Sequence, residues 1–310
     1  MINGTVSMYS VFYTRKENSL WTLHDLFNEL SLYLQNSYNA TINTQFGGHV
    51  YVELFNYNVG DCEIIIYNDE NDSLKIISFS EIKTDVIDIL KTRNNPNDIL
   101  IVLHNLSWGN HLTDLDNYKF KLKPTTFYPF SPKINYHFFY NTRKLKKEND
   151  LIDKMFLRTT TGRGDEYKLS SIGLINELFP GLPFEEYLEK AICYKVGLSI
   201  PTSTYELCHR DFDYMSIGLP LMRLELIGNY YPKLLPNYHY ISINRNSLST
   251  DNYSALVGGD AYIEAYKNKF YEIKNNIDFL NFISKNAFDY YNKYCSPHNR
   301  LKHILNLLEI

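Results

Sequence analysis

The chain has 310 residues and a formal net charge of −4, with 44% hydrophobic and 21% charged residues. These proportions are typical of a soluble globular protein, and the interspersed charges give no broad basic face for nucleic acid. The four cysteines are widely spaced and form no C-x-x-C pair, so neither a zinc site nor a disulfide framework is indicated. The sequence starts without a signal-peptide pattern and holds no apolar stretch of about 18 residues, so we expect a cytoplasmic protein without a membrane span.

The first third of the chain reads as a small α/β lobe. Apolar residues at helical spacing predict a helix over 20–36, and a strand is expected at 48–55. Residues 62–80 predict two strands joined by an Asn/Asp turn. A predicted helix over 84–93 then precedes a short buried strand at 98–105.

A proline-punctuated stretch separates this lobe from the rest. Residues 117–148 end in a basic run, 143–147, which we interpret as a solvated helix or loop face. We therefore expect an N-terminal lobe over 1–135 and a C-terminal lobe over 136–310.

The second lobe again alternates strands and helices. We predict strands at 154–162, 196–201, 220–226 and 239–243, and a helix at 170–179. Residues 183–195 are expected to hold a helix and the start of a strand, and the last fifty residues are expected to be helical. The whole pattern predicts an α/β protein of two Rossmann-like lobes, with a reduced N-terminal lobe and a helical C-terminus.

Residues 208–220 (CHRDFDYMSIGLP) contain the first candidate site. Asp211 and Asp213 would suit a metal if they stood at the end of a buried strand. The predicted strand ends well before them, and a short helix closed by Gly218 follows. An acidic residue is favoured at a helix start without a metal, and backbone N–H groups with Arg210 suit a phosphate there. We therefore expect a phosphate and ribose pocket at this helix.

The run 195–243 resembles the donor-binding half of GT-B glycosyltransferases, most of all the exostosin-type and protein O-glucosyltransferase-like families. The matching positions are Gly197, Ser199, Arg210, Asp213, Gly218, Pro220 and the segment 236–241 (PNYHYI). The resemblance implies that Arg210 binds the donor diphosphate and that Asp213 accepts hydrogen bonds from the ribose. It also implies that Gly197, Ser199 and His239 belong to the donor side. By the same resemblance, 136–310 would be the nucleotide-sugar-binding C-terminal lobe and 1–135 the acceptor-side N-terminal lobe. Those families more often have Glu at the acidic position, so Asp213 departs from their pattern.

Residues 156–175 are similar to the strand and loop that open the second lobe of such enzymes. In this segment Arg158 or Arg163 would offer bidentate donors to phosphate oxygens. A plain surface arginine in a glycine turn explains Arg163 equally well. The resemblance further implies that a terminal helix, 298–308, crosses back to the first lobe.

The acidic turn 68–72 (NDEND) is the strongest rival metal site, because it follows an apolar run. Asp69 and Asp72 could bind manganese there. The residues after the turn alternate like a returning strand, and Asn and Asp favour turns by bonding their own backbone. We therefore favour a solvated hairpin turn.

An acceptor-side base is the least defined part of the site, since it needs only a carboxylate or an imidazole near the acceptor hydroxyl. His104 is the first candidate, because polar residues at the carboxyl end of a strand lie where α/β sites form. His49 is the second, with Glu53 and Asp61 as open alternatives. A structural role remains the alternative for each histidine.

The sequence therefore predicts a metal-independent glycosyltransferase without a cofactor, which moves a sugar from a UDP- or GDP-linked donor to a carbohydrate or other hydroxyl acceptor. Arginines and helix N-termini would stabilise the leaving diphosphate. Two alternatives stay open. One is a manganese-dependent GT-A enzyme that uses Asp69/Asp72 or Asp211/Asp213, and the other is an inactive scaffold that binds nucleotide-sugars or glycans.

Overall fold

The computed structural model forms two compact units. It describes residues 4–11, 14–15, 18–19, 29–30, 32–34, 36, 42–46, 48–51, 57–62, 64–69, 71–78, 84–103, 117–125, 134–157, 169–175, 182–200, 207–226, 231–244 and 260–310. The first unit contains Met1–Ile134, Asn229–Pro232 and Tyr294–Ile310, and the second contains Asn135–Gly228 and Lys233–Lys293. The terminal helix thus groups with the first unit, as the resemblance implied, while the expected domain division at residue 135 stays a prediction.

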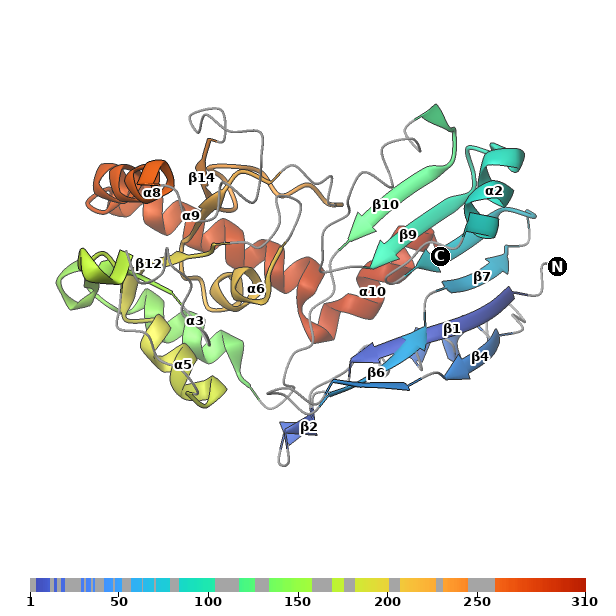
Figure 1. Ribbon diagram of the computed structural model, residues 1–310, viewed down its shortest axis with the longest axis horizontal. Coiled ribbons are helices and arrows are strands. Elements are labelled where there is room, and N and C mark those ends of the chain that lie inside the picture. The colour runs from blue at the N-terminus through green and yellow to red at the C-terminus, as the bar shows by residue number, and fades with distance from the viewer. Residues whose placement is uncertain are drawn as a thin grey trace. The chain divides into compact units, whose positions relative to one another are not determined.

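The described part of the first unit contains two four-stranded sheets and a small ribbon (Figure 1). One sheet has the order β4–β1–β6–β5 and comprises β1 (Gly4–Val11), β4 (Ile42–Phe46), β5 (Gly48–Tyr51) and β6 (Tyr57–Cys62). The ribbon pairs β2 (Thr14–Arg15) with β3 (Asn18–Ser19). The other sheet has the order β10–β9–β8–β7 and comprises β7 (Ile64–Asn68), β8 (Leu74–Ser78), β9 (Ile99–Leu103) and β10 (Lys121–Thr125).

Two helices cover opposite faces of the sheet β10–β9–β8–β7. Strands β8, β9 and β10 are parallel, and α2 (Thr84–Arg93) joins β8 to β9. On one face Leu74, Ile76, Leu100 and Val102 are buried together with Leu90 of α2. Successive side chains of a strand point to opposite faces. The other face therefore carries Lys121, Lys123 and Thr125. Lys123 and Thr125 contact α10 (Pro297–Leu308), and Lys121 contacts Glu309, the residue after it.

The second unit is a parallel sheet with the order β11–β12–β13–β14. Its strands are β11 (Ile152–Phe156), β12 (Tyr194–Leu198), β13 (Leu221–Leu224) and β14 (Ile241–Ile243). Its described helices are α3 (Tyr136–Lys144), α5 (Phe184–Ala191), α6 (His209–Ser216), α8 (Asp260–Ile273) and α9 (Ile277–Tyr290), and Glu148–Asp150 forms a 3₁₀ turn. A π-helical turn, Tyr291–Cys295, follows α9.

Both faces of this sheet are covered, as expected for parallel strands. On one face Met155, Val196 and Met222 join a core that includes Tyr266 and Phe270 of α8. On the other face, Phe156 contacts Tyr214 of α6, and Arg223 pairs with Asp211 of α6. The α/β class and the helical C-terminal region predicted from the sequence are therefore confirmed.

Most expected elements are present, with three differences. Ile175, expected inside a helix over 170–179, instead forms a strand bridge with Met155. Strands β1, β4, β6 and β10, the ribbon of β2 and β3, and helix α3 were not expected. Arg143, expected on a solvated face, is buried on α3. The described residues of the expected helix over 20–36 are helical.

Candidate functional site

The sheet of the second unit changes its winding direction at β11. Met155 of β11 pairs with Val196 of β12 on one side and bridges Ile175 in parallel on the other. The chain therefore leaves β11 toward Ile175 and returns to the opposite side of β11 for β12. In open α/β sheets, ligands bind outside the carboxyl ends of the strands at such a switch point. The carboxyl ends of β11 and β12 are therefore the candidate site.

The start of α6 lies at this carboxyl edge. The Oγ atom of Ser199, just after β12, lies 3.0 Å from Sγ of Cys208, the residue before α6. Nη1 of Arg210 donates to the carbonyl oxygen of Ile200 at 3.3 Å. These contacts hold the first turn of α6 next to the end of β12, with Arg210 half-buried there. A helix N-terminus in this place presents backbone N–H groups and a positive dipole end to an anion.

Asp211 fixes the start of α6. Its carboxylate accepts a hydrogen bond from the N–H group of Cys208 at 2.9 Å and forms an ion pair with Arg223 of β13. Both side chains are fully buried. A cation at Asp211 would have to displace the guanidinium group of Arg223. The interpretation of 208–220 as a charged helix start is therefore confirmed, and the arrangement counts against the metal pair Asp211/Asp213.

Three predicted donor-side residues are buried in this unit: Gly197, Ser199 and Asp213. A Cβ atom on Gly197 would lie 2.6 Å from Cδ2 of Tyr214, so glycine is required for α6 to pack this closely on β12. The burial of Asp213 counts against a direct contact with ribose hydroxyl groups. The donor-side roles of all three residues stay predictions.

The Cys208 thiol lies beside the hydroxyl of Ser199. Burial raises its pKa to about 11, so the thiol stays protonated at neutral pH.

Gly218, expected to close the helix, has a φ of 64°, and the next residue, Leu219, donates its N–H to the carbonyl of Tyr214. That left-handed glycine is the expected end of α6.

His239 lies at the opposite edge of the sheet from the candidate site. It precedes β14, so it is at the amino end of a strand that runs parallel to β12 and β13. Its Nδ1 atom accepts a hydrogen bond from the N–H group of Leu235 at 2.9 Å, and its ring contacts Tyr238 and Tyr290. Burial lowers the pKa of His239 to about 4, which leaves the ring neutral at pH 7. This position counts against a donor-binding role.

Several predicted residues lie outside the described part of the chain. These are Arg158, Arg163, His104, and the side chain of His49, whose backbone pairs with Val59 between β5 and β6. The arginines follow β11 in sequence, and His104 follows β9. Their roles stay predictions.

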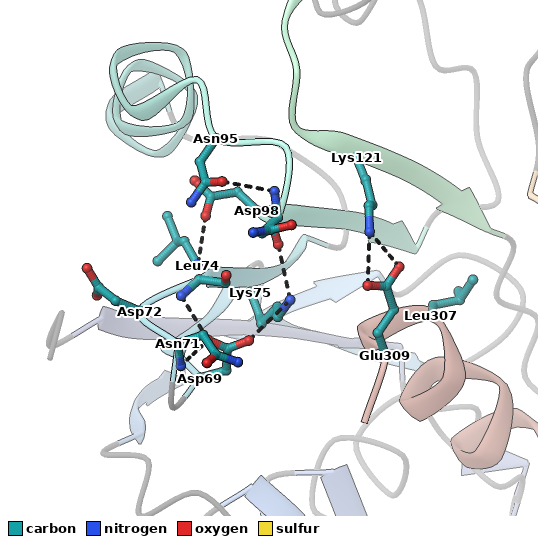
Figure 2. Close-up of polar contacts among 12 residues, drawn as sticks. Asp69, Asn71, Asp72, Leu74, Lys75, Asn95, Asp98, Lys121, Leu307 and Glu309 are labelled. Carbon is teal, nitrogen blue, oxygen red and sulfur yellow. Dashed lines mark hydrogen bonds and ion pairs between the residues drawn. The ribbon is translucent and has the colours of Figure 1, made fainter.

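The acidic turn 68–72 is a hairpin turn between β7 and β8 (Figure 2). Oδ1 of Asp69 accepts hydrogen bonds from the N–H groups of Asn71 at 2.9 Å and Ser73 at 2.8 Å. Oδ2 of Asp69 lies 3.5 Å from Nζ of Lys75. The carboxylate of Asp69 therefore stabilises the turn, and the hairpin interpretation is confirmed. Among the residues that the structure describes, no group of three or more His, Cys, Asp or Glu side chains could hold a metal ion.

Sequence reasoning missed Arg143, which joins three parts of the second unit. Its guanidinium group donates hydrogen bonds to the carbonyl oxygens of Ile192, Tyr194, Lys195 and Gly218. These bonds fix the start of β12 and the end of α6, the two elements that form the site. Helical periodicity could have indicated that Arg143 is buried, because it lies seven residues after Tyr136 and four after Phe139, which are both buried.

No family model matches the sequence, and no curated protein matches it either. Similar solved structures include a glycosyltransferase from Rickettsia africae ESF-5, at 13% identity and a TM-score of 0.45, covering 90% of this chain and 73% of that one. The pneumococcal O-GlcNAc transferase GtfA in complex with UDP and GlcNAc has 12% identity and a TM-score of 0.36, over 85% and 69% of the two chains. TarM has 11% identity and a TM-score of 0.32, over 81% and 64%. These TM-scores are below 0.5, so the likeness by itself carries no conclusion about activity. The exostosin-type part of the resemblance stays a prediction.

Proposed function

We propose that the protein is a GT-B-type glycosyltransferase that binds a nucleotide-diphospho-sugar through its second unit. The observation that carries the proposal is the switch point between β11 and β12, with the first turn of α6 and Arg210 held at its carboxyl edge. A diphosphate is the ligand that suits a helix N-terminus beside an arginine.

The chemistry proposed for this edge is electrostatic. An acceptor oxygen would form a bond to the anomeric carbon, the bond from that carbon to the diphosphate would break, and its electron pair would leave with the diphosphate. Arg210 and the N–H groups of α6 would stabilise the charge that develops on this leaving group. Arg158 or Arg163 would add a second guanidinium group, and His104 or His49 would take the acceptor proton.

We propose that no metal is required for this chemistry. In each candidate acidic pair, the first carboxylate already has partners within the protein. Asp211 forms an ion pair with Arg223, and Asp69 accepts a hydrogen bond from the N–H group of Ser73 and lies near Lys75. An arginine and a helix N-terminus would stabilise the leaving group in place of a cation.

Several properties stay predictions from the sequence. These are the identity of the base, a UDP- or GDP-linked donor, the acceptor, a cytoplasmic location and the lack of a nucleic acid partner. None of the described helices is both long and apolar enough to cross a membrane.

The proposal is tested by thermal shift with UDP-, GDP-, TDP- and CMP-sugars, each with and without EDTA. A ligand at about 100 times its dissociation constant stabilises a protein by roughly 2.7 kcal/mol. Arg210→Ala should weaken binding of the nucleotide by about 10- to 100-fold, the value of hydrogen bonds to a charged group. Lys144→Ala is the matched control, because Lys144 is an exposed basic residue of the same unit on α3.

The expected result is stabilisation by one nucleotide class, insensitive to EDTA, weakened in Arg210→Ala and unchanged in Lys144→Ala. Stabilisation that requires manganese would favour the GT-A alternative. Binding without hydrolysis or transfer of the sugar would favour the inactive scaffold.

A further inference from the structure

The end of α3 exposes an apolar side chain within the basic run 143–147. Arg143 is buried, and its Nη1 atom donates to the carbonyl oxygen of Tyr194 at 2.6 Å. Leu145, two residues later, is 84% exposed. The sequence favoured a solvated charged face for this run, but the fold buries the arginine and leaves the leucine in water. The run therefore presents an apolar side chain, in place of its arginine, to the solvent.

A second apolar side chain lies on the same face of α3. Phe138 is 58% exposed and precedes Leu145 by seven residues, which is about two helical turns. The count holds as far as Leu145, because this C-cap residue still has helical backbone angles. Asn141, which lies between them on that face, is also exposed. Phe138 and Leu145 therefore form an apolar stripe on the solvent side of α3, and the opposite face holds the buried residues of the helix.

Three lysines border the C-terminal end of this apolar stripe: Lys144, Lys146 and Lys147. Lys144 and Lys147 are exposed, and none of the three forms an ion pair within the described part of the chain. Two acidic residues follow, Glu148 and Asp150. The carboxylate of Asp150 accepts a hydrogen bond from the backbone N–H group of Lys147 at 3.1 Å. The three ammonium groups are therefore free to meet a negatively charged partner.

Hydrogen bonds hold the backbone of this surface. The N–H group of Leu145 donates to the carbonyl oxygen of Asn141 at 3.2 Å, and that of Lys146 donates to the carbonyl oxygen of Arg143 at 3.0 Å. The 3₁₀ turn Glu148–Asp150 follows at once. A surface that is already ordered loses less conformational entropy when it binds. The backbone that carries the stripe and the lysines is therefore ordered before a partner arrives.

The surface lies at the amino edge of the parallel sheet. Arg143 bonds the start of β12, and Ile152, the first residue of β11, is 41% exposed at the same edge. The candidate site lies at the carboxyl ends of β11 and β12. A partner at the end of α3 therefore leaves the candidate site of this unit open.

We propose that the end of α3 is a docking surface for an anionic lipid membrane. The side chains of Phe138 and Leu145 enter the boundary between headgroups and acyl chains, and the three lysines meet the lipid phosphates. Two apolar side chains are too few for the about 800 Å² per partner that a stable protein interface buries. The unpaired lysines select a negatively charged surface. This docking does not depend on the glycosyltransferase activity.

The test is sedimentation of the full chain with vesicles of phosphatidylcholine alone, and of phosphatidylcholine mixed with phosphatidylglycerol. The wild type should bind only the mixed vesicles, and binding should weaken as salt rises, because salt screens exposed charges. Lys144→Ala and Lys147→Ala should each weaken binding about fivefold, the value of one lysine at an anionic surface. Leu145→Ser should weaken it about tenfold or more, the value of burying a leucine side chain.

Matched controls come from exposed residues elsewhere in the same unit. Lys285→Ala removes a lysine of α9 that is paired with Asp289, and Tyr271→Ser removes a side chain of α8 that is 53% exposed. Neither should change vesicle binding. Glu148→Gln should strengthen it, because one negative charge is removed beside the lysines. The midpoint of thermal unfolding should stay the same in Leu145→Ser, since that side chain is exposed.

A wild type that does not bind mixed vesicles, or binds phosphatidylcholine equally well, would overturn the proposal. So would equal vesicle binding by Leu145→Ser and the wild type. A concentration-dependent dimer that Leu145→Ser abolishes would assign the surface to a second copy of this chain and would overturn it too. Failure of the proposed function is seen separately, as the absence of nucleotide-sugar binding.

Discussion

Helix α6 begins at the carboxyl edge of the parallel sheet of the second unit, and α10 packs on the parallel strand β10 of the mixed sheet of the first unit. The first helix is anchored by a buried ion pair and the second by an exposed one. The start of α6 is fixed by Asp211 and Arg223, whose side chains are 0% exposed. The end of α10 is fixed by Glu309, which is 44% exposed and lies 2.9 Å from Lys121 and 2.9 Å from Lys123.

The difference in burial predicts how much each ion pair contributes to the stability of its helix. Removal of one partner from a buried pair leaves the other charge in a low dielectric, which is strongly destabilising. An exposed pair contributes little and weakens with salt. We therefore expect the anchor of α6 to depend little on ionic strength, and the anchor of α10 to respond to pH and ionic strength.

The largest effect should come from breaking the buried anchor. Asp211→Asn keeps the shape of the side chain but leaves Arg223 without that carboxylate, and should lower the free energy of unfolding by about 3–5 kcal/mol. Urea denaturation measures this loss. The double variant Asp211→Leu/Arg223→Met should lose less than Asp211→Asn, because it buries no charge. A loss below about 1 kcal/mol in Asp211→Asn would show that the pair does not anchor α6.

A smaller effect should come from forcing α6 away from β12. Gly197→Ala should cost about 1–3 kcal/mol, because the new methyl group meets the fully buried ring of Tyr214. Gly173→Ala is the comparison, since Gly173 has a φ of 73° and no atom within 4 Å of a new Cβ, so it tests backbone strain alone. Thermal unfolding of both variants measures the losses. Weaker nucleotide binding should accompany Gly197→Ala only.

The smallest effect should come from the exposed anchor. Glu309→Gln should lower the free energy of unfolding by about 0.2–1 kcal/mol at low salt, and by less in 1 M salt. Hydrogen bonds from Lys123 and Lys121 lower the pKa of Glu309 to about 2 from 4.5. A carboxyl group with a lowered pKa stabilises the fold above its unfolded pKa. The difference between wild type and Glu309→Gln should therefore be constant above about pH 4.5 and disappear as pH falls toward 2. Denaturation at several pH values checks this, and a difference that grew on acidification would contradict it.

Elements with an uninterrupted apolar periodicity could be predicted from the sequence. The prediction was wrong where a single proline or glycine decides the local structure. The expected helix over 84–93 has the bounds of α2. Strand β10 was missed because it contains Pro124, which an edge strand such as β10 tolerates. Ile175 was assigned to a helix because the left-handed turn at Gly173, which ends that helix, is not visible in an apolar pattern.

The candidate site was predictable only in part. Arg210 and the charged start of α6 could be located, because helix-start chemistry is local. The partners of Asp211 and Arg143 could not, because Arg223 is 12 residues away and the carbonyl groups bound by Arg143 are up to 75 residues away. His239 lies at the edge of the sheet opposite to the candidate site because of the direction of β14. The direction of a strand within a sheet cannot be predicted from a local sequence pattern.

The most direct test of the central claim is amide hydrogen exchange of the wild type with and without UDP, in the presence of EDTA. The account predicts slower exchange at the end of β12 and in the first turn of α6, from Ser199 to Phe212, because the nucleotide phosphates bind there. No protection there, or protection confined to the hairpin turn 68–72 in a parallel sample with manganese in place of EDTA, would contradict it.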